Sequence, residues 1–267
     1  MRSPPWAQAA LGIVMLASSA ATMYIAPRAL VSHAEELPPC EGFLCSNRLA
    51  VIVDARSVPK YVVASFPLFI VQLLAEMAVL AATRSRPQSG AATYSLADTW
   101  SSLAAGVCSQ LSGALVVGPL GLRVLPYAYV LQHYRLAPLL PTDHPGTWLA
   151  TFLLVDLCYY YLHRQGHAYA LFWAGHSVHH GSEHFNLSTA LRQSWLHGLV
   201  SWVYYLPLAV CGVPPAVYLA TSQWNLLYQF WVHTCCIRRL PAPVEFLFST
   251  PSHHVSTQRI RSVWPGL

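Results

Sequence analysis

Long apolar stretches are the feature that most restricts how this chain folds. Residues 61–82 (YVVASFPLFIVQLLAEMAVLAA) contain one charged residue, Glu76. A helix of about 20 apolar residues crosses the hydrocarbon layer of a bilayer. We therefore predict a membrane-spanning helix here. We also expect Glu76 to face the interior of a helix bundle, because a carboxylate in lipid is costly.

Further apolar runs indicate further membrane helices. Residues 6–27 form either a signal anchor or a cleaved signal peptide. Residues 98–131 carry glycine and proline in their middle, which predicts two shorter helices, and residues 147–162 form another apolar and aromatic run. Charged residues make up 9% of the 267 residues, whereas soluble domains carry about 25%. We therefore expect an all-α, polytopic integral membrane helical bundle.

The positive charge of the chain fits a membrane protein. The net charge of +5 comes from dispersed arginines rather than from a basic cluster, which argues against a nucleic-acid partner. Arg84 and Arg86 follow shortly after the apolar run at 61–82. They are expected in the cytosol, because cytosolic loops are enriched in basic residues. The expected partner is the lipid bilayer.

Residues 163–180 (HRQGHAYALFWAGHSVHH) contain five of the 13 histidines. Residues four apart share a helix face, so His163 pairs with His167, and His176 with His180, while His179 lies beside the second pair. A single histidine is more often a hydrogen-bonded core residue. Five imidazoles at this spacing, without interleaved carboxylates or thiolates, indicate iron, zinc or copper. Two adjacent metal ions explain their number best.

Other metal chemistries fit this stretch poorly. A zinc protease of the H-E-x-x-H type needs glutamate after the first histidine, but Arg164 follows His163. A haem takes two axial ligands and leaves three histidines without a role. A metal transporter would place polar residues along several spans, whereas these histidines gather at helix ends.

A helical hairpin is predicted to bring distant histidines to the same place. The apolar runs 190–211 and 216–232 are joined by Gly-Val-Pro-Pro, so the chain returns to the side that it left. We therefore expect a histidine-rich metal site at the cytosolic face. The additional histidines that the hairpin delivers are His233, His253 and His254, and His184 lies close enough to join them.

Two polar residues near this site carry separate predictions. Asp156 precedes His163 by about two helical turns, so it either holds that imidazole or makes an independent structural hydrogen bond. Asn186 begins an N-x-S sequon. We expect it to be unmodified because it follows the histidine stretch on the cytosolic side.

The histidine spacings resemble the three boxes, HxxxH, HxxHH and HxxHH, of the fatty acid hydroxylase and sterol desaturase superfamily of membrane di-iron enzymes. Residues 173–194 (WAGHSVHHGSEHFNLSTALRQS), 225–234 (NLLYQFWVHT) and 249–254 (STPSHH) are similar to its alkylglycerol monooxygenase family. The nearest alternative is a sterol or fatty acid hydroxylase.

The resemblance implies a ligand set and a chemistry. Enzymes of this family are multi-pass proteins of the endoplasmic reticulum membrane. With a di-iron site, O2 and tetrahydrobiopterin, they hydroxylate the ether-linked carbon of an alkylglycerol, which releases a fatty aldehyde and a glycerol derivative. The metal ligands carried over to this sequence are His163, His167, His176, His179, His180, His233 and His254.

The sequence departs from the family pattern at the third box. A complete HxxHH box from His254 would place histidines at the positions of Thr257 and Gln258. The resemblance therefore divides the chain into an apolar segment and polar loop at 1–57, an incomplete hydroxylase-type membrane domain at 58–254 and a divergent tail at 255–267, as expected of a C-terminally truncated form. Two hypotheses follow, a membrane di-iron monooxygenase and a catalytically inactive membrane variant.

Overall fold

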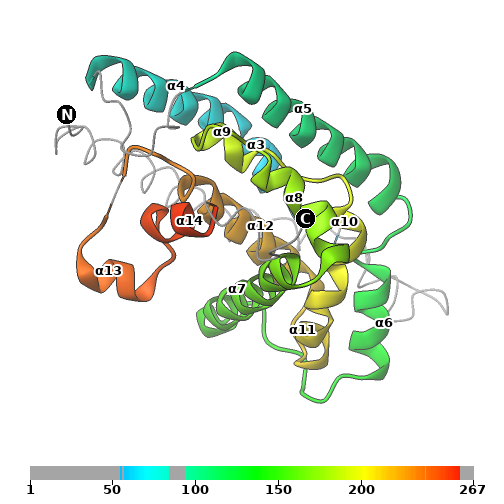
Figure 1. The fold of residues 1–267 in the computed structure, drawn as a ribbon. Coiled ribbons are helices and arrows are strands. Elements are labelled where there is room, and N and C mark those ends of the chain that lie inside the picture. Colours follow the sequence, from blue (N-terminus) through cyan, green and yellow to red (C-terminus); the bar gives the residue numbers. More distant parts are fainter. Residues whose placement is uncertain (1–54, 56, 84–93, 238, 259–267) are drawn as a thin grey trace.

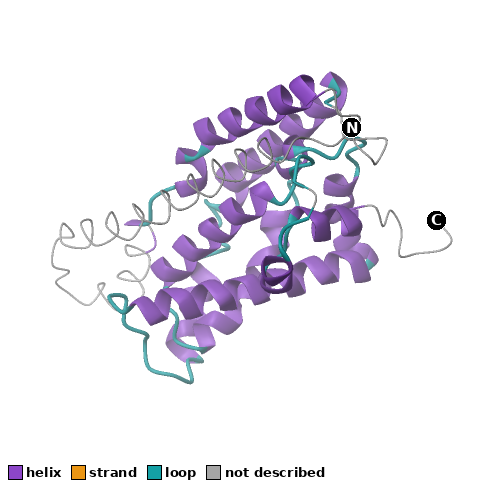
Figure 2. Ribbon diagram, turned by 90° about the vertical axis from the view of Figure 1, so that its left-hand side faces the viewer, coloured by secondary structure: helices purple, strands orange, loops and turns teal. Residues whose placement is uncertain are grey.

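The computed structural model describes residues 55, 57–83, 94–237 and 239–258 (Figure 1). All regular elements in these residues are helices (Figure 2), so the all-α prediction is confirmed. The apolar run at 6–27, the basic residues Arg84 and Arg86, and most of the tail lie outside the described residues.

The membrane-spanning helix predicted at 61–82 forms two consecutive helices, α3 (Tyr61–Ala64) and α4 (Phe66–Thr83). Pro67 stands in the first turn of α4, where its missing N–H is tolerated, and Ser65 separates the two helices. The side chain of Glu76 is fully buried, as predicted. Much of the opposite apolar surface of α4 is exposed, including Val71 and Leu74.

The next helix, α5 (Leu96–Ser112), continues without a break into a π-helical turn, η2 (Gly113–Val117). The run at 98–131 is divided into two helices, as predicted: the chain widens to π geometry at Gly113, leaves helical geometry at Gly118 and Pro119, and begins a second helix at Leu125. Within the described part of the chain, Leu96–Val117 is the one helix long and apolar enough to cross a membrane.

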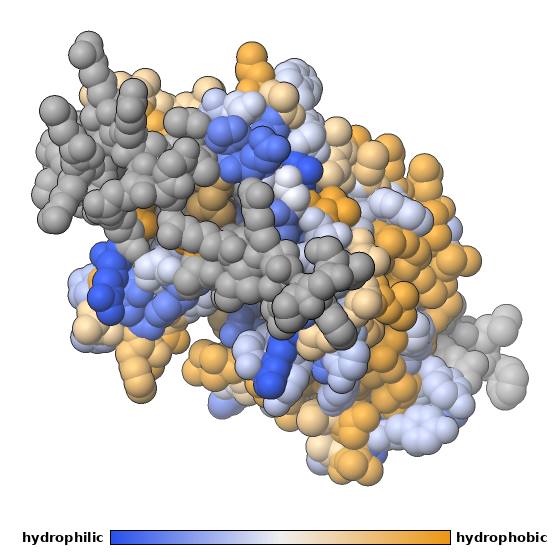
Figure 3. Space-filling view, in the orientation of Figure 1, coloured by the Kyte–Doolittle hydropathy of each residue, from blue (hydrophilic) through white to orange (hydrophobic). Residues whose placement is uncertain are grey.

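Apolar side chains gather along the right-hand edge of the molecule in Figure 3, the side on which Figure 1 places α5 and α6 (Leu125–His133). Trp100 on α5, Leu115 on η2 and Leu125 on α6 are among the exposed apolar side chains. A surface of this kind is unfavourable in water and favourable in lipid.

The centre of the bundle is α7 (Pro145–Ala168), which packs most extensively against α12 (Pro215–Trp231) and α8 (Ala170–His180). Pro145 starts α7 at a position that needs no N–H donor, and His144 caps it by accepting the N–H of Gly146 at Nδ1. In the core beside α7, the ring of Tyr127 stacks on Tyr218 with centroids 4.7 Å apart.

The first leg of the predicted hairpin is not one helix. It consists of α9 (Leu187–Ala190), α10 (His197–Val200), the 3-10 turn η3 (Ser201–Tyr205) and α11 (Leu206–Val210). Pro207 lacks the N–H that a continuing helix would need, and it stands in the first turn of α11, where that N–H is not required. The second leg is the continuous helix α12, and α13 (Ala242–Leu247) and α14 (Pro251–Gln258) follow it.

A close approach at Gly106 provides a test of this packing. A Cβ atom there would lie 2.6 Å from the main-chain oxygen of Leu191, which follows α9, whereas nothing lies within 4 Å of a Cβ at Gly113. Overpacking of this kind costs about 1–3 kcal/mol. We expect Gly106→Ala to lower the midpoint of thermal unfolding in detergent, and the matched control Gly113→Ala to leave it unchanged or higher. Equal shifts in the two variants would contradict the contact between α5 and α9.

Candidate metal centre

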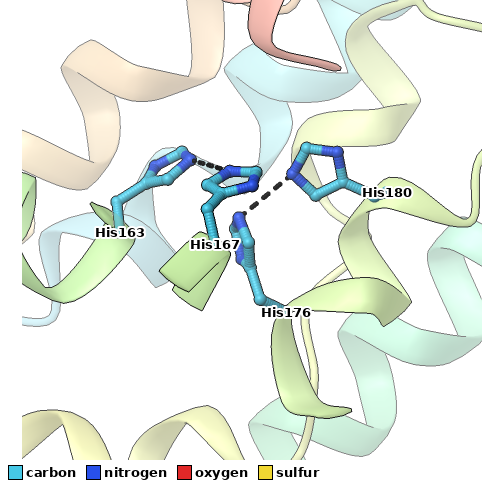
Figure 4. A group of neighbouring side chains, drawn as sticks. All are labelled: His163, His167, His176 and His180. Carbon is cyan, nitrogen blue, oxygen red and sulfur yellow. Dashed lines mark hydrogen bonds between the residues drawn. The ribbon is translucent and has the colours of Figure 1, made fainter. Parts of the chain in front are cut away.

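Helices α7 and α8 bring four histidines together in what we call the four-histidine group: His163, His167, His176 and His180 (Figure 4). One nitrogen from each ring lies within 4.8 Å of the other three. The Nε2 atoms of His163 and His167 are 3.0 Å apart, and those of His176 and His180 are 3.1 Å apart. The two histidines of each pair are four residues apart on one helix, and their rings lie on the same helix face, as predicted.

The connection between α7 and α8 explains why the two pairs meet. A single residue in extended conformation, Tyr169, separates the helices, so the end of α7 lies close to α8. Gly166 faces the contact, and a Cβ atom there would lie 3.1 Å from the ring of His176. The absence of a side chain at Gly166 therefore makes room for an imidazole.

A second set, the three-histidine group, consists of His179, His233 and His254. His179 comes from α8, His233 from the turn after α12 and His254 from α14. The Nε2 atom of His233 lies 3.2 Å from that of His179 and 3.0 Å from that of His254. The return of the chain along α12 thus places His233 beside the histidines of α8.

The two groups are neighbours. The rings of His176 and His179 stack with centroids 5.7 Å apart, and the rings of His163 and His254 lie 6.2 Å apart. The structure therefore brings together the seven histidines that were predicted as metal ligands. Their role as ligands remains a prediction.

Hydrogen bonds assign the tautomers of two rings. His179 donates from Nδ1 to the main-chain oxygen of Arg192 at 3.1 Å, and His233 donates from Nδ1 to that of Gln229 at 2.9 Å. A carbonyl oxygen only accepts, so the proton of each neutral ring is on Nδ1 and a lone pair is on Nε2. These two lone pairs face each other across 3.2 Å. The arrangement is repulsive without a cation between them.

Burial keeps these rings neutral. Burial and, to a smaller extent, the neighbouring histidines together lower the pKa of His176 to about 2. Burial likewise lowers the pKa of His233 to about 4, although its hydrogen bond to the carbonyl of Gln229 opposes the shift. The pKa values of His179 and His254 are also lowered well below 6.5, again mainly by burial. Neutral imidazole is the form that binds metal ions.

An ion pair supports the carbonyl that orients His179. The guanidinium of Arg192 donates from Nε to the main-chain oxygen of Val178 at 2.8 Å and pairs through Nη1 with Asp98 at 3.3 Å. Asp98 also accepts the hydroxyl of Ser182 at 2.7 Å. The pair thus joins the start of α5 to the end of α8. Asp98 and Arg192 had no predicted role, although an acidic residue at the start of an apolar run indicates a buried polar contact.

Asp156 takes the second of the two roles left open by the sequence. Its Oδ1 atom accepts a hydrogen bond from the side-chain amide of Asn225 at 2.8 Å, which joins α7 to α12. The amide of Gln229 donates in turn to Asn225. Asp156 therefore supports helix packing, and no described contact links it to His163.

Two histidines that were predicted to lie at the metal site, His253 and His184, are outside both groups. His253 pairs with Glu245 at 3.4 Å and is half exposed. The main-chain N–H of His184 donates to Asp98 at 3.2 Å, and the ring is not part of either group. His197 also lies outside them.

The sequon asparagine is buried. Asn186 has no exposed surface, and its Oδ1 atom accepts the main-chain N–H of Ser188 at 2.9 Å and the Ser188 hydroxyl at 2.6 Å. The side chain therefore caps α9. Its burial supports the prediction that it carries no glycan.

Comparisons with known proteins agree with this geometry. Residues 148–256, which include all seven histidines of the two groups, match the fatty acid hydroxylase family. Alkylglycerol monooxygenase of Xenopus tropicalis is 43% identical over 201 residues, and that of Homo sapiens is 44% identical over 199 residues. These alignments cover 75% and 74% of this chain and 42% of either relative.

A more distant relative shows the same relationship. Alkylglycerol monooxygenase of Caenorhabditis elegans is 30% identical over 212 residues, which are 79% of this chain and 40% of that protein. No solved structure matches the chain. The chain thus spans about two fifths of the length of its curated relatives. Within that span, residues 148–256 match the fatty acid hydroxylase family, and the chain is similar to alkylglycerol monooxygenases.

Proposed function

We propose that this chain holds the di-iron centre of a membrane monooxygenase that cleaves the ether bond of alkylglycerols. The reaction consumes O2 and tetrahydrobiopterin and yields a fatty aldehyde and a glycerol derivative. The proposal takes its substrate class from the relatives, which are named alkylglycerol monooxygenases. It takes its metal from the two histidine groups and the fatty acid hydroxylase match.

The observation that carries the proposal is the pair of facing lone pairs on His179 and His233. Two imidazole nitrogens bound to one metal ion at about 2.1 Å are separated by roughly 3.0–3.4 Å, for bond angles between octahedral and tetrahedral values. The described Nε2 separations of 3.0 Å, 3.1 Å and 3.2 Å lie in this range. The seven rings therefore fit two adjacent metal ions, one in each group.

The residues of the site would hold and shield the irons, whose chemistry when bound is the activation of O2. The Nδ1 hydrogen bonds of His179 and His233 fix the direction of each ring and keep Nε2 available. The ring of Phe185 stacks on His233 with centroids 5.9 Å apart and limits access of water to that side. Tetrahydrobiopterin would supply electrons.

The proposed location is the endoplasmic reticulum membrane, with several spans. The apolar helix Leu96–Val117 and the exposed apolar side of α4 suit contact with lipid. The exposed residue Arg239 follows the turn that carries His233, which favours a cytosolic position for the metal centre. The lipid chain of an alkylglycerol would then approach the metals from the bilayer side.

Iron content and turnover test the proposal directly. We expect the chain, purified in detergent with iron supplied, to contain two irons, one for each histidine group, by elemental analysis. With O2 and tetrahydrobiopterin it should release a fatty aldehyde from an alkylglycerol. Two irons without turnover would favour the alternative of an inactive membrane variant, and absence of bound iron would contradict the proposed centre.

Substitution of single histidines tests the division between ligands and ordinary residues. We expect His176→Ala to remove about one iron per chain, because it takes one donor from the four-histidine group. His197→Ala is the matched control and should leave the iron content unchanged, since His197 belongs to neither group. A similar loss of iron in both variants would contradict this division.

The space that Gly166 leaves for the His176 ring allows a test of the four-histidine group in which no histidine is removed. Because a Cβ atom at Gly166 would lie 3.1 Å from the His176 ring, we expect Gly166→Ala to weaken iron binding by about 10-fold through displacement of that ligand. Gly175→Ala on α8 is the control, since its Cβ would meet nothing closer than 3.7 Å. Competition with a chelator measures both affinities. Equal affinities in the two variants would show that Gly166 does not set the position of His176.

A further inference from the structure

Glu76 is a fully buried carboxylate at some distance in sequence from every histidine of the two groups. It lies on α4 among apolar side chains, where Phe69 stacks on Phe230 with centroids 4.3 Å apart. Within the described residues, no lysine or arginine pairs with it. A buried carboxylate without a cation is costly unless hydrogen bonds compensate it.

Both oxygens of Glu76 accept hydrogen bonds. The Oε2 atom accepts the hydroxyl of Tyr94 at 2.5 Å and the main-chain N–H of Leu187 at 2.8 Å. The Oε1 atom accepts the hydroxyl of Thr234 at 2.5 Å and the main-chain N–H of Cys235 at 2.9 Å. The carboxylate is therefore surrounded by donors.

Two of these donors, Thr234 and Cys235, lie in the turn that carries His233 of the three-histidine group. Thr234 directly follows the ligand His233, and its hydroxyl also accepts the N–H of Cys236 at 3.2 Å, so one oxygen of Glu76 holds the turn after α12. Leu187 begins α9, and the other oxygen of Glu76 therefore holds the segment that follows α8 and its histidines. A single side chain thus joins α4 to both segments.

A third metal site is the competing explanation, because Glu76, Cys235 and Cys236 also place donor atoms within 4.8 Å of one another. A metal ion there would need a free carboxylate lone pair facing both thiols. Five donors already contact the oxygens of Glu76: two hydroxyls, two main-chain N–H groups and the thiol of Cys235, whose Sγ lies 3.5 Å from Oε1. A thiol that donates a hydrogen bond is protonated, whereas the metal-binding form is the thiolate. The hydrogen-bond arrangement favours a structural anchor over a metal ligand.

We propose that Glu76 is a positioning residue for the three-histidine group, and that it acts by fixing the turn that presents His233. The inference rests on the proposed function, because it assumes that His233 binds a metal ion. Glu76 does not touch the metal or the substrate in this proposal. It selects the position of His233 relative to His179, which lies on a different helix.

The isosteric change Glu76→Gln is a sharp test of this role. Each oxygen of Glu76 faces one main-chain N–H, from Leu187 or from Cys235. Either orientation of a glutamine amide therefore points its NH2 group at an N–H that can only donate. The volume is conserved and the polarity at one contact is reversed, so the turn after α12 should shift.

The experiment measures iron affinity by chelator competition in two backgrounds of the full chain. In His176→Ala, the intact iron site is the three-histidine group, and we expect the addition of Glu76→Gln to weaken it by about 10- to 100-fold. In His233→Ala, the intact site is the four-histidine group, and we expect the same addition to leave its affinity unchanged. A general loss of structure would weaken both sites.

A milder pair of variants covers the case in which Glu76→Gln does not fold. Thr234→Val removes one hydroxyl donor at nearly constant volume, and Thr234→Ser retains it. In the His176→Ala background, we expect weaker iron binding in Thr234→Val and near-normal binding in Thr234→Ser. Met77→Leu, at the exposed neighbour of Glu76, controls for changes in α4.

The outcomes separate this proposal from the proposed function. If neither background binds iron, the metal centre itself is wrong and the positioning role falls with it. If both backgrounds bind iron and Glu76→Gln changes neither affinity, or weakens both equally, the positioning role alone is overturned. A loss confined to the three-histidine group supports it.

Discussion

The mutual repulsion of imidazole lone pairs is the constraint on which the rest of this structure depends. His179 and His233 each donate their ring N–H to a main-chain carbonyl, and their Nε2 atoms face each other at 3.2 Å. Buried neutral rings do not adopt this arrangement for their own stability. The surrounding helices therefore hold the rings in place, and a bound cation would supply the attraction that the protein alone lacks.

Two buried carboxylates provide that support from different helices. Asp98 at the start of α5 anchors Arg192, whose carbonyl orients His179. Glu76 on α4 anchors the turn that carries His233. Each carboxylate is costly to bury and is compensated by several donors, so its cost is offset only when the native segments are in place. Such contacts favour one arrangement of the histidines over others.

The apolar surface and the metal centre occupy different parts of the same helices. The exposed apolar side chains of α4 and α5 suit lipid, while Glu76 and Asp98 on these two helices point inward to the segments that carry histidines. A monooxygenase acting on an ether lipid needs both features close together, because its substrate is held in the bilayer and its metals need polar ligands. This division of helix faces is consistent with the proposed function.

The sequence by itself determined the helical class, the inward position of Glu76 and the pairing of His163 with His167 and of His176 with His180, because these follow from apolar length and from helical periodicity. It misjudged the helix at 190–211, where local caps and Pro207 outweigh an apolar pattern. Only the tertiary structure decided that the seven histidines divide into two groups, that His253 pairs with Glu245, and that Asp156 bonds to Asn225. These choices depend on contacts between residues remote in sequence, whose geometry no local pattern encodes.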